Sequence, residues 1–223
     1  MHPSAIVHEA LEQQLDIIAI CDHNTSENVR YVVNAAQGTG LVVIGGMEVT
    51  SREEVHIIAL FEHLDALSRL QDYVFANLEG LNDENAFGLQ VIVDETGEVQ
   101  GFNERLLIGA TQIPMEEVIE KINELDGLAI AAHIDRPSFS VISQLGFVPE
   151  HVPFDALEIS ARLSIVEARN KFSELSRYPF ITSSDAHFIK DIGAAATKMC
   201  LEEASFSEIR MALRKENGRY ILE

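Results

Sequence analysis

The sequence has few basic residues, few cysteines and no long apolar run, and each shortage argues against a class of protein. Lysine and arginine number 16 against 36 acidic residues, which gives a formal net charge of −20 and argues against a nucleic-acid duplex as the main partner. No apolar stretch approaches the roughly 20 residues that cross a bilayer. No signal segment opens the chain, so we expect a cytoplasmic protein with no membrane partner. Two cysteines, Cys21 and Cys200, are too few for a disulfide framework.

The length of 223 residues and the apolar content of 47% predict one domain, 1–223, with a substantial core. Strand-length apolar runs alternate with helical patterns, which is typical of an α/β fold built around a parallel sheet. The run Ile17–Cys21 suits a strand buried on both faces. The other expected strands are 41–47, 55–61, 128–132, 154–159, 179–183 and 196–201. Apolar residues at helical spacing, with start signals at Pro3 and Ser4 for the first, predict helices at about 5–15, 26–36, 64–78, 113–125, 139–145, 163–176 and 205–215.

The composition changes between residues 79 and 112. Two short apolar stretches, 91–93 and 99–102, flank a turn that contains Gly97, and this pattern predicts a β-hairpin. We interpret 79–112 as an insertion that lies over the mouth or the side of the fold.

Residues that bind metals recur at the ends of these expected strands. Imidazole nitrogens and carboxylate oxygens suit Zn, Mn or Fe, and one carboxylate can bridge two ions. Because α/β folds carry their chemistry at the carboxyl ends of strands, we expect a shared site. Asp185 and His187 are two apart, so on an extended chain both would point the same way. The candidate ligands are His23, Glu48, His56, His133, Asp185 and His187.

Each candidate also has an ordinary structural interpretation. His56 alone is more typical of a hydrogen-bonded histidine of the core or surface. Asp22 could cap the helix that begins near Ser26, and Glu48 could pair with Arg52. Together the candidates favour a site, because a buried charge without a partner or a metal is costly. We assign no functional role to His2, His8, His63 or His151.

Four segments resemble the successive motifs of the PHP family, the polymerase and histidinol phosphatase superfamily. They are Cys21–Thr25, Met47–His56, Ala132–Pro137 and Ser184–His187. The resemblance implies a distorted (β/α)7 TIM-like barrel that holds up to three divalent ions and hydrolyses phosphate esters.

The resemblance also implies a role for each residue. His23, Asp185 and His187 would hold one ion, Glu48 would bridge the other two, and His56 and His133 would complete the second. Asp22 would lie next to His23 without touching the ion, in a position to orient its ring. Arg136 would bind a phosphate oxygen, and Arg136 and Asp185 are the expected catalytic residues.

The sequence departs from the family at one point. The family pattern opens with His-x-His at the end of a first strand, and this sequence contains no His-x-His. We therefore expect a late start or, as the alternative, a natural form that lacks part of the site. In either case we expect a missing first strand, fewer than three bound ions and impaired activity. The exposed barrel edge could pair with a second copy.

Three functions follow as hypotheses. The first is a metal-dependent phosphoesterase that acts on a small phosphorylated molecule or a short nucleotide. The second is a non-catalytic metal-binding module, either regulatory or degenerate. The third is a metal-dependent hydrolase of another bond, such as an amide or a lactone.

Overall fold

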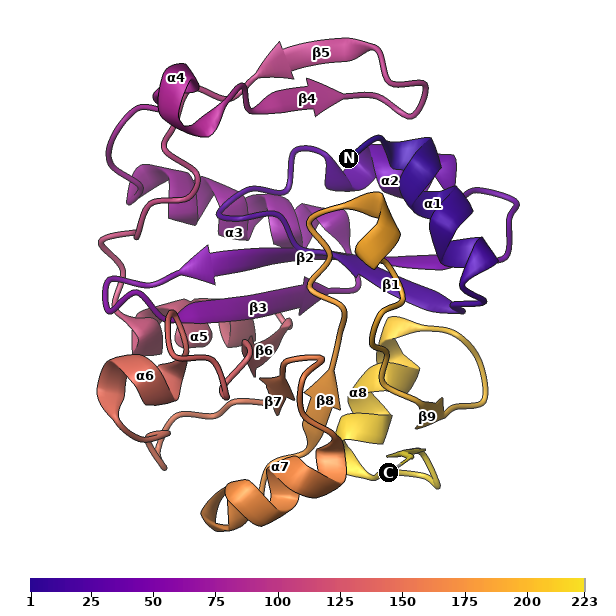
Figure 1. Cartoon of the computed structure of the whole chain (residues 1–223), viewed down its shortest axis with the longest axis vertical. Coiled ribbons are helices and arrows are strands. Elements are labelled where there is room, and N and C mark those ends of the chain that lie inside the picture. The colour runs from indigo at the N-terminus through magenta and orange to yellow at the C-terminus, as the bar shows by residue number, and fades with distance from the viewer. Residues whose placement is uncertain (223) are drawn as a thin grey trace.

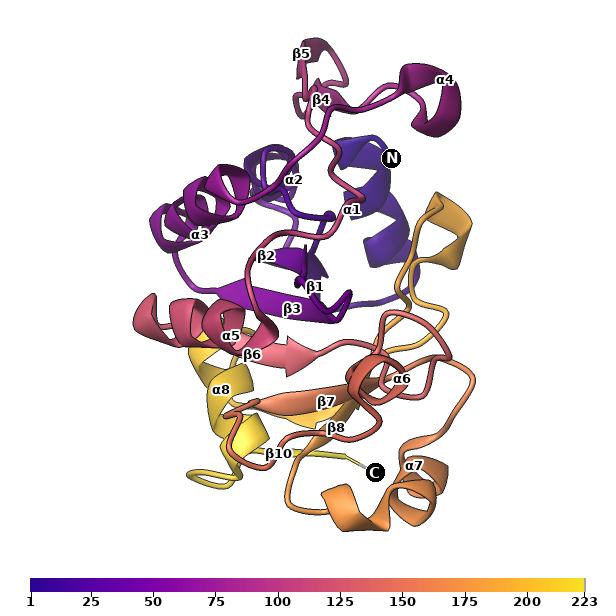
Figure 2. The same ribbon diagram turned by 90° about the vertical axis from the view of Figure 1, so that its left-hand side faces the viewer.

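The computed structural model describes residues 1–222 and shows a mixed α/β chain arranged around a six-stranded sheet (Figure 1). The strands follow one another in the order β1-β2-β3-β6-β7-β8, and Figure 2 shows the succession from β3 through β6 and β7 to β8 running down the molecule. The sheet curls into a half-barrel. Its strands are β1 (Ile17–Ile20), β2 (Val42–Thr50), β3 (His56–Phe61), β6 (Leu128–Ala131), β7 (Ala156–Ile159) and β8 (Phe180–Thr182).

Strand β3 runs against both of its neighbours, so the sheet is not parallel throughout as the sequence pattern predicted. β1 and β2, β6 and β7, and β7 and β8 pair in parallel, whereas β3 is antiparallel to β2 and to β6. A tight turn after Thr50 reverses the chain, and the Ser51 amide donates to the Val55 carbonyl at 2.9 Å. The first residue of β3, His56, therefore pairs with Thr50 at the carboxyl end of β2.

Strand β1 lies at one edge of the sheet and β8 at the other. Ala19 is exposed and the rest of β1 is only half-buried, so the expectation of a strand buried on both faces is wrong. The reason is that an edge strand has a neighbour on one side only. The expected strand 196–201 shortens to β9 (Met199–Cys200), which pairs with β10 (Tyr220–Ile221) and not with the sheet. The family's count of seven barrel strands stays a prediction.

The two faces of the sheet pack against different helices, because side chains alternate along a strand. On β3, Ile57, Ala59 and Phe61 belong to the main core, which includes residues of α3 and α5. Leu60 points the other way and packs in a cluster with Phe206 and Leu213 of α8. These helices are α3 (Leu64–Ala76), α5 (Met115–Glu124) and α8 (Phe206–Arg214).

A third cluster joins the first two helices to the segment that follows β8. Ile6 and Val32 pack there with Ile192, so this segment lies against α1. The predicted helices are confirmed at somewhat shorter lengths: α1 (Pro3–Glu12), α2 (Val29–Ala35), α6 (Val141–Leu145) and α7 (Ile165–Lys171), with short 3-10 turns at Ser173–Leu175 and Ile189–Asp191.

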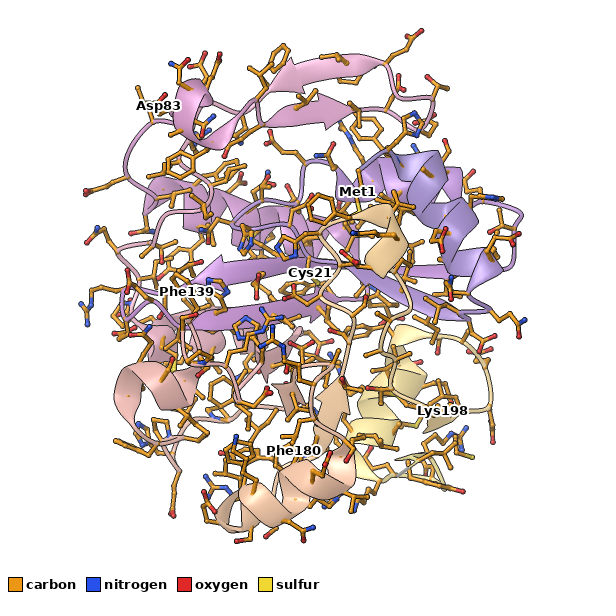
Figure 3. The ribbon with its side chains drawn as sticks, in the orientation of Figure 1. Met1, Cys21, Asp83, Phe139, Phe180 and Lys198 are labelled. Atoms are coloured by element: carbon orange, nitrogen blue, oxygen red, sulfur yellow. The ribbon has the colours of Figure 1, made fainter. Side chains whose placement is uncertain are left out.

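Residues 79–112 form a lobe at one end of the molecule. It holds α4 (Glu84–Phe87), β4 (Val91–Val93) and β5 (Val99–Phe102), and the two strands pair antiparallel. Figure 3 shows Asp83 in this lobe far from Phe180 of β8. Its status as an insertion into the family's barrel stays a prediction. Within residues 1–222, no helix combines the length and apolarity needed to cross a membrane.

Candidate metal centre

The carboxylate of Glu48 lies at the centre of a group of imidazoles. Glu48 is buried, and one of its oxygens, Oε1, lies 3.2 Å from His56 Nδ1 and 3.5 Å from His133 Nε2. The other oxygen, Oε2, lies 3.2 Å from His23 Nδ1. Three of the four imidazoles predicted from the sequence thus surround the predicted bridging acid.

The reversal of β3 explains how these side chains meet. His23 follows β1 and His133 follows β6, so both lie at carboxyl ends of strands, whereas His56 is the first residue of β3. Because β3 is antiparallel, its beginning lies at the same rim. Glu48 is inside β2 and not beyond its end as the sequence suggested, since β2 continues to Thr50.

The unpaired nitrogens of the group show what it is suited to hold. The Nδ1 atoms of His23, His56 and His133 are buried and have no hydrogen-bond partner, although two of them lie close to Glu48. One ligand atom from each of His23, Glu48 and His56 lies within 4.8 Å of the others. Buried polar atoms normally have partners, and this set of nitrogen and oxygen donors fits a divalent cation.

The protonation states also suit metal binding. Burial alone would raise the pKa of Glu48, but the imidazoles of His133 and His56 hold it well below its usual range. Burial lowers the pKa of His23. At neutral pH the group therefore presents a carboxylate and a neutral imidazole, which are the forms that coordinate metals.

The remaining candidates lie on the open side of the group. The His187 ring is 5.9 Å from the His23 ring, and its Nδ1 is 3.8 Å from Asp185 Oδ1. Asp185 has a φ of 46°, so the chain turns there and the expected extended geometry is wrong. Arg136 Nη2 lies 2.6 Å from Asp185 Oδ2, so the two expected catalytic side chains are paired with each other.

The structure does not contain the Glu48–Arg52 pair or the Asp22 helix cap that the sequence offered as alternatives to a metal site. Arg52 lies near Glu53, not Glu48. Asp22 does not cap α2, whose N-cap position is Asn28. The histidines left without a role lie outside the group: His151 pairs with Glu116, His2 contacts the Thr96 carbonyl, and His63 precedes α3.

Three residues of the centre were missed in the sequence. Asn24 is fully buried, and its side chain accepts from the Thr50 amide and donates to the carbonyls of Leu107 and Gly109. The Phe139 ring stacks on His56 with centroids 4.7 Å apart; Figure 3 marks Phe139 in the loop after β6. Glu158 lies beneath His133. The signal available for Glu158 was an acid between two apolar residues, Leu157 and Ile159, of the expected strand 154–159, since a buried charge needs a partner.

The fold and the donor set define a class, an α/β chain whose sheet rim carries a candidate centre of imidazoles and carboxylates. A family model described as PHP-associated matches residues 169–217, which include β8, β9 and α8. The resemblance to the PHP family drawn from the motifs is thereby confirmed.

Two curated proteins match parts of the sequence. The uncharacterized protein YqxK of Bacillus subtilis is 32% identical over 108 residues, which cover 46% of this chain and 28% of that protein. A 5'-3' exoribonuclease of Haemophilus influenzae is 32% identical over 63 residues, 27% of this chain and 23% of that enzyme. The matched part is thus about a quarter of the length of each relative.

Solved structures show the same fold. A lesion-specific endonuclease from Pyrococcus furiosus superposes with a TM-score of 0.73 at 18% identity, over 99% of this chain and 53% of that one. A proposed metal-dependent phosphoesterase from Bifidobacterium adolescentis superposes with a TM-score of 0.58 at 16% identity, over 96% and 91% of the two chains. The chain therefore spans about half of the endonuclease and nearly all of the second protein.

Proposed function

We propose that this chain is a metal-dependent hydrolase of phosphate esters. The observation that carries the proposal is the buried Glu48 carboxylate, which lies within 3.5 Å of nitrogens of three imidazoles. Buried Nδ1 atoms of these imidazoles lack hydrogen-bond partners. A buried carboxylate surrounded by nitrogen donors without hydrogen-bond partners is costly unless a cation binds among them.

His23, Glu48 and His56 would hold the first cation, with His133 as a further donor to it. Asp185 and His187 would serve a second cation on the open side. When bound, such a cation supplies Lewis-acid stabilisation of charge on a phosphoryl group. Zn, Mn and Fe all suit these donors.

The chain's own residues would act on the substrate around these ligands. Arg136 would donate to a phosphoryl oxygen, because a guanidinium offers paired donors that match a phosphate. It would leave Asp185 to do so, since the two are paired at 2.6 Å. The freed Asp185 carboxylate would accept a proton from the attacking water and pass it to the leaving oxygen.

The substrate would be a small phosphorylated molecule or a short nucleotide. The names of two similar proteins support a nucleotide, since one is an exoribonuclease and the other an endonuclease. The excess of 36 acidic over 16 basic residues argues against tight binding of a duplex, which depends on clustered cations.

The test is a panel of esters assayed with added Mn²⁺ or Zn²⁺. It would contain para-nitrophenyl phosphate, bis-para-nitrophenyl phosphate, a mononucleotide and a short single-stranded oligonucleotide. We expect metal-dependent release of phosphate or cleavage of the diester, abolished by a chelator and by Glu48→Gln. Equal rates for the wild type and Glu48→Gln would refute the proposal.

A non-catalytic metal-binding module is the second candidate. The observation that favours it is the pairing of Arg136 with Asp185 at 2.6 Å, which occupies both of the expected catalytic side chains. Metal binding with no turnover of any ester in the panel would support this candidate.

A further inference from the structure

Glu158 occupies a buried position directly behind the metal centre. It is the third residue of β7, its side chain is buried, and no motif drew attention to it. One carboxylate oxygen, Oε2, accepts from the backbone amide of His133 at 3.1 Å. The other, Oε1, accepts from the hydroxyl of Ser183.

The bond to His133 acts on a residue with an uncommon backbone conformation. His133 has a φ of 30°, and residues other than glycine occupy this region only when their surroundings hold them there. Glu158 bonds to both sides of this strained residue. Its carboxylate binds the His133 amide, and its backbone carbonyl accepts from the Ile134 amide at 2.8 Å.

The bond to Ser183 acts on a second loop of the site. Ser183 follows β8 and precedes Asp185 by two residues, and Asp185 also has a positive φ, at 46°. A single carboxylate thus joins the loop that presents His133 to the loop that presents Asp185 and His187. These loops come from different strands, β6 and β8, and Glu158 stands on β7 between them.

A carboxylate is an expensive way to fill a buried position if its only task is packing. Apolar residues of similar volume usually serve a core equally well or better. Each carboxylate oxygen of Glu158 instead accepts one hydrogen bond from a different loop. This arrangement fits a residue that fixes the distance between two sets of ligands.

We propose that Glu158 is a positioning residue of the metal centre, which holds the His133 loop and the Asp185 loop in the geometry that binds cations. This inference rests on the proposed metal-dependent function and deepens it. Glu158 acts through the backbone of His133 and the hydroxyl of Ser183, so it need not touch the cation. Its removal should weaken metal binding without unfolding the chain.

The test uses Co²⁺ alone, whose absorption spectrum reports ligand number and geometry. Supporting groups behind metal ligands typically contribute about 10- to 100-fold in affinity. We expect Glu158→Ala to weaken Co²⁺ binding by about that factor and to change the spectrum. Glu158→Gln should restore most of the affinity, because its amide oxygen can still accept from the His133 amide. Ser183→Ala, which removes one of the two loops from the network, should give an intermediate loss.

Glu208→Ala is the matched control. Glu208 is also a buried acid, but it lies on α8 and pairs with Arg219 rather than with a loop of the metal centre. This variant should lower the melting temperature of the metal-free protein and leave Co²⁺ affinity and spectrum unchanged. Melting temperatures of all variants without metal separate a loss of fold from a loss of geometry, and Ser183→Ala decides the matter if Glu158→Ala does not fold.

Two results would overturn the inference, and they are distinguishable. If the wild type binds Co²⁺ and Glu158→Ala and Ser183→Ala bind it equally well with the same spectrum, Glu158 has no positioning role, while the proposed function stands. If the wild type binds no Co²⁺, Mn²⁺ or Zn²⁺, the proposed function itself fails, and the role of Glu158 fails with it.

Discussion

The guanidinium of Arg136 lies 2.6 Å from the carboxylate of Asp185, so each neutralises the other at the open side of the metal centre. Both residues come from loops beyond the strands, the first after β6 and the second after β8. A substrate phosphate would compete with Asp185 for Arg136. On the proposed function, the binding of an anion would therefore be linked to the release of the Asp185 carboxylate.

Replacement of Arg136 by alanine should weaken the use of phosphate esters. A hydrogen bond to a charged group contributes about 1.5 to 3 kcal/mol, so we expect kcat/KM to fall by about 10- to 100-fold. Arg136→Lys should recover only part of this, because an ammonium cannot bind two oxygens in the same plane. Steady-state kinetics on the ester panel measure the effect. Arg69→Ala, at an exposed position on α3, is the control, and equal losses in both variants would contradict the role of Arg136.

Metal should stabilise the folded chain through Glu48. At a free cation concentration of about 100 times the dissociation constant, binding adds about 2.7 kcal/mol, which corresponds to roughly 5 to 10 °C in melting temperature for a domain of this size. Thermal unfolding with Mn²⁺ and with a chelator measures the difference. Glu48→Gln should abolish it, whereas His63→Ala, an exposed histidine outside the centre, should keep it. A metal-induced shift that survives in Glu48→Gln would show that the cation binds elsewhere.

Asn24 should be essential to the packing of the lobe against the sheet. Its carboxamide holds the Thr50 amide at 3.0 Å and the carbonyls of Leu107 and Gly109 at 2.8 Å each. Asn24→Ala leaves these groups without a partner, so we expect a loss of about 2 to 4 kcal/mol in the free energy of unfolding. Hydrogen exchange should accelerate in residues 107–111 more than in the sheet. Asn34→Ala, at an exposed position of α2, should change neither quantity.

Glu53 should make the stability of the chain depend on acid pH. Burial alone would raise its pKa, but hydrogen bonds from the Met115 amide and the Ser51 hydroxyl outweigh burial and hold the pKa below its usual value. A carboxyl whose pKa is lower in the folded state stabilises the fold above the pKa of the unfolded chain, about 4.5 or slightly below, and this contribution is lost as the pH falls through the folded pKa.

The measurement is urea unfolding of the wild type and of Glu53→Gln between pH 3 and pH 7. We expect the variant to be less stable by about 1 kcal/mol at pH 7, the usual value of a side chain that binds the first amide of a helix, and the difference to shrink toward pH 3. The neighbouring Glu54→Gln serves as control, because Glu54 is exposed. A difference that is constant with pH would contradict the assignment.

The local structure of this chain was largely readable from its sequence. The run 17–20 forms β1, because a short continuous apolar run is typical of a strand. The spacing of apolar residues after Pro3 forms α1, because a period of 3.6 residues indicates the buried face of a helix. The partial exposure of β1 could not be predicted from the sequence. A continuous apolar run looks the same in a central strand and in an edge strand, and only the pairing of the sheet separates them.

The ligands were found by residue type and by their places beside strands. His23 and His133 follow apolar runs, as the pattern predicts. Glu158 escaped notice because it lies inside a strand, where a single acid carries no periodic signal. The pairing of Arg136 with Asp185 escaped notice because the two residues are 49 positions apart and belong to different loops.

The sequence by itself determined the α/β class, the boundaries of most helices and strands, and the set of imidazoles and carboxylates that could bind a cation, because these depend on local pattern and on chemistry. Only the tertiary structure decided that β3 is antiparallel to β2 and β6. That reversal brings the first residue of one strand to the rim formed by the ends of others, and it puts His56 beside Glu48. The direction of a strand depends on long-range pairing, which no local stretch of sequence records.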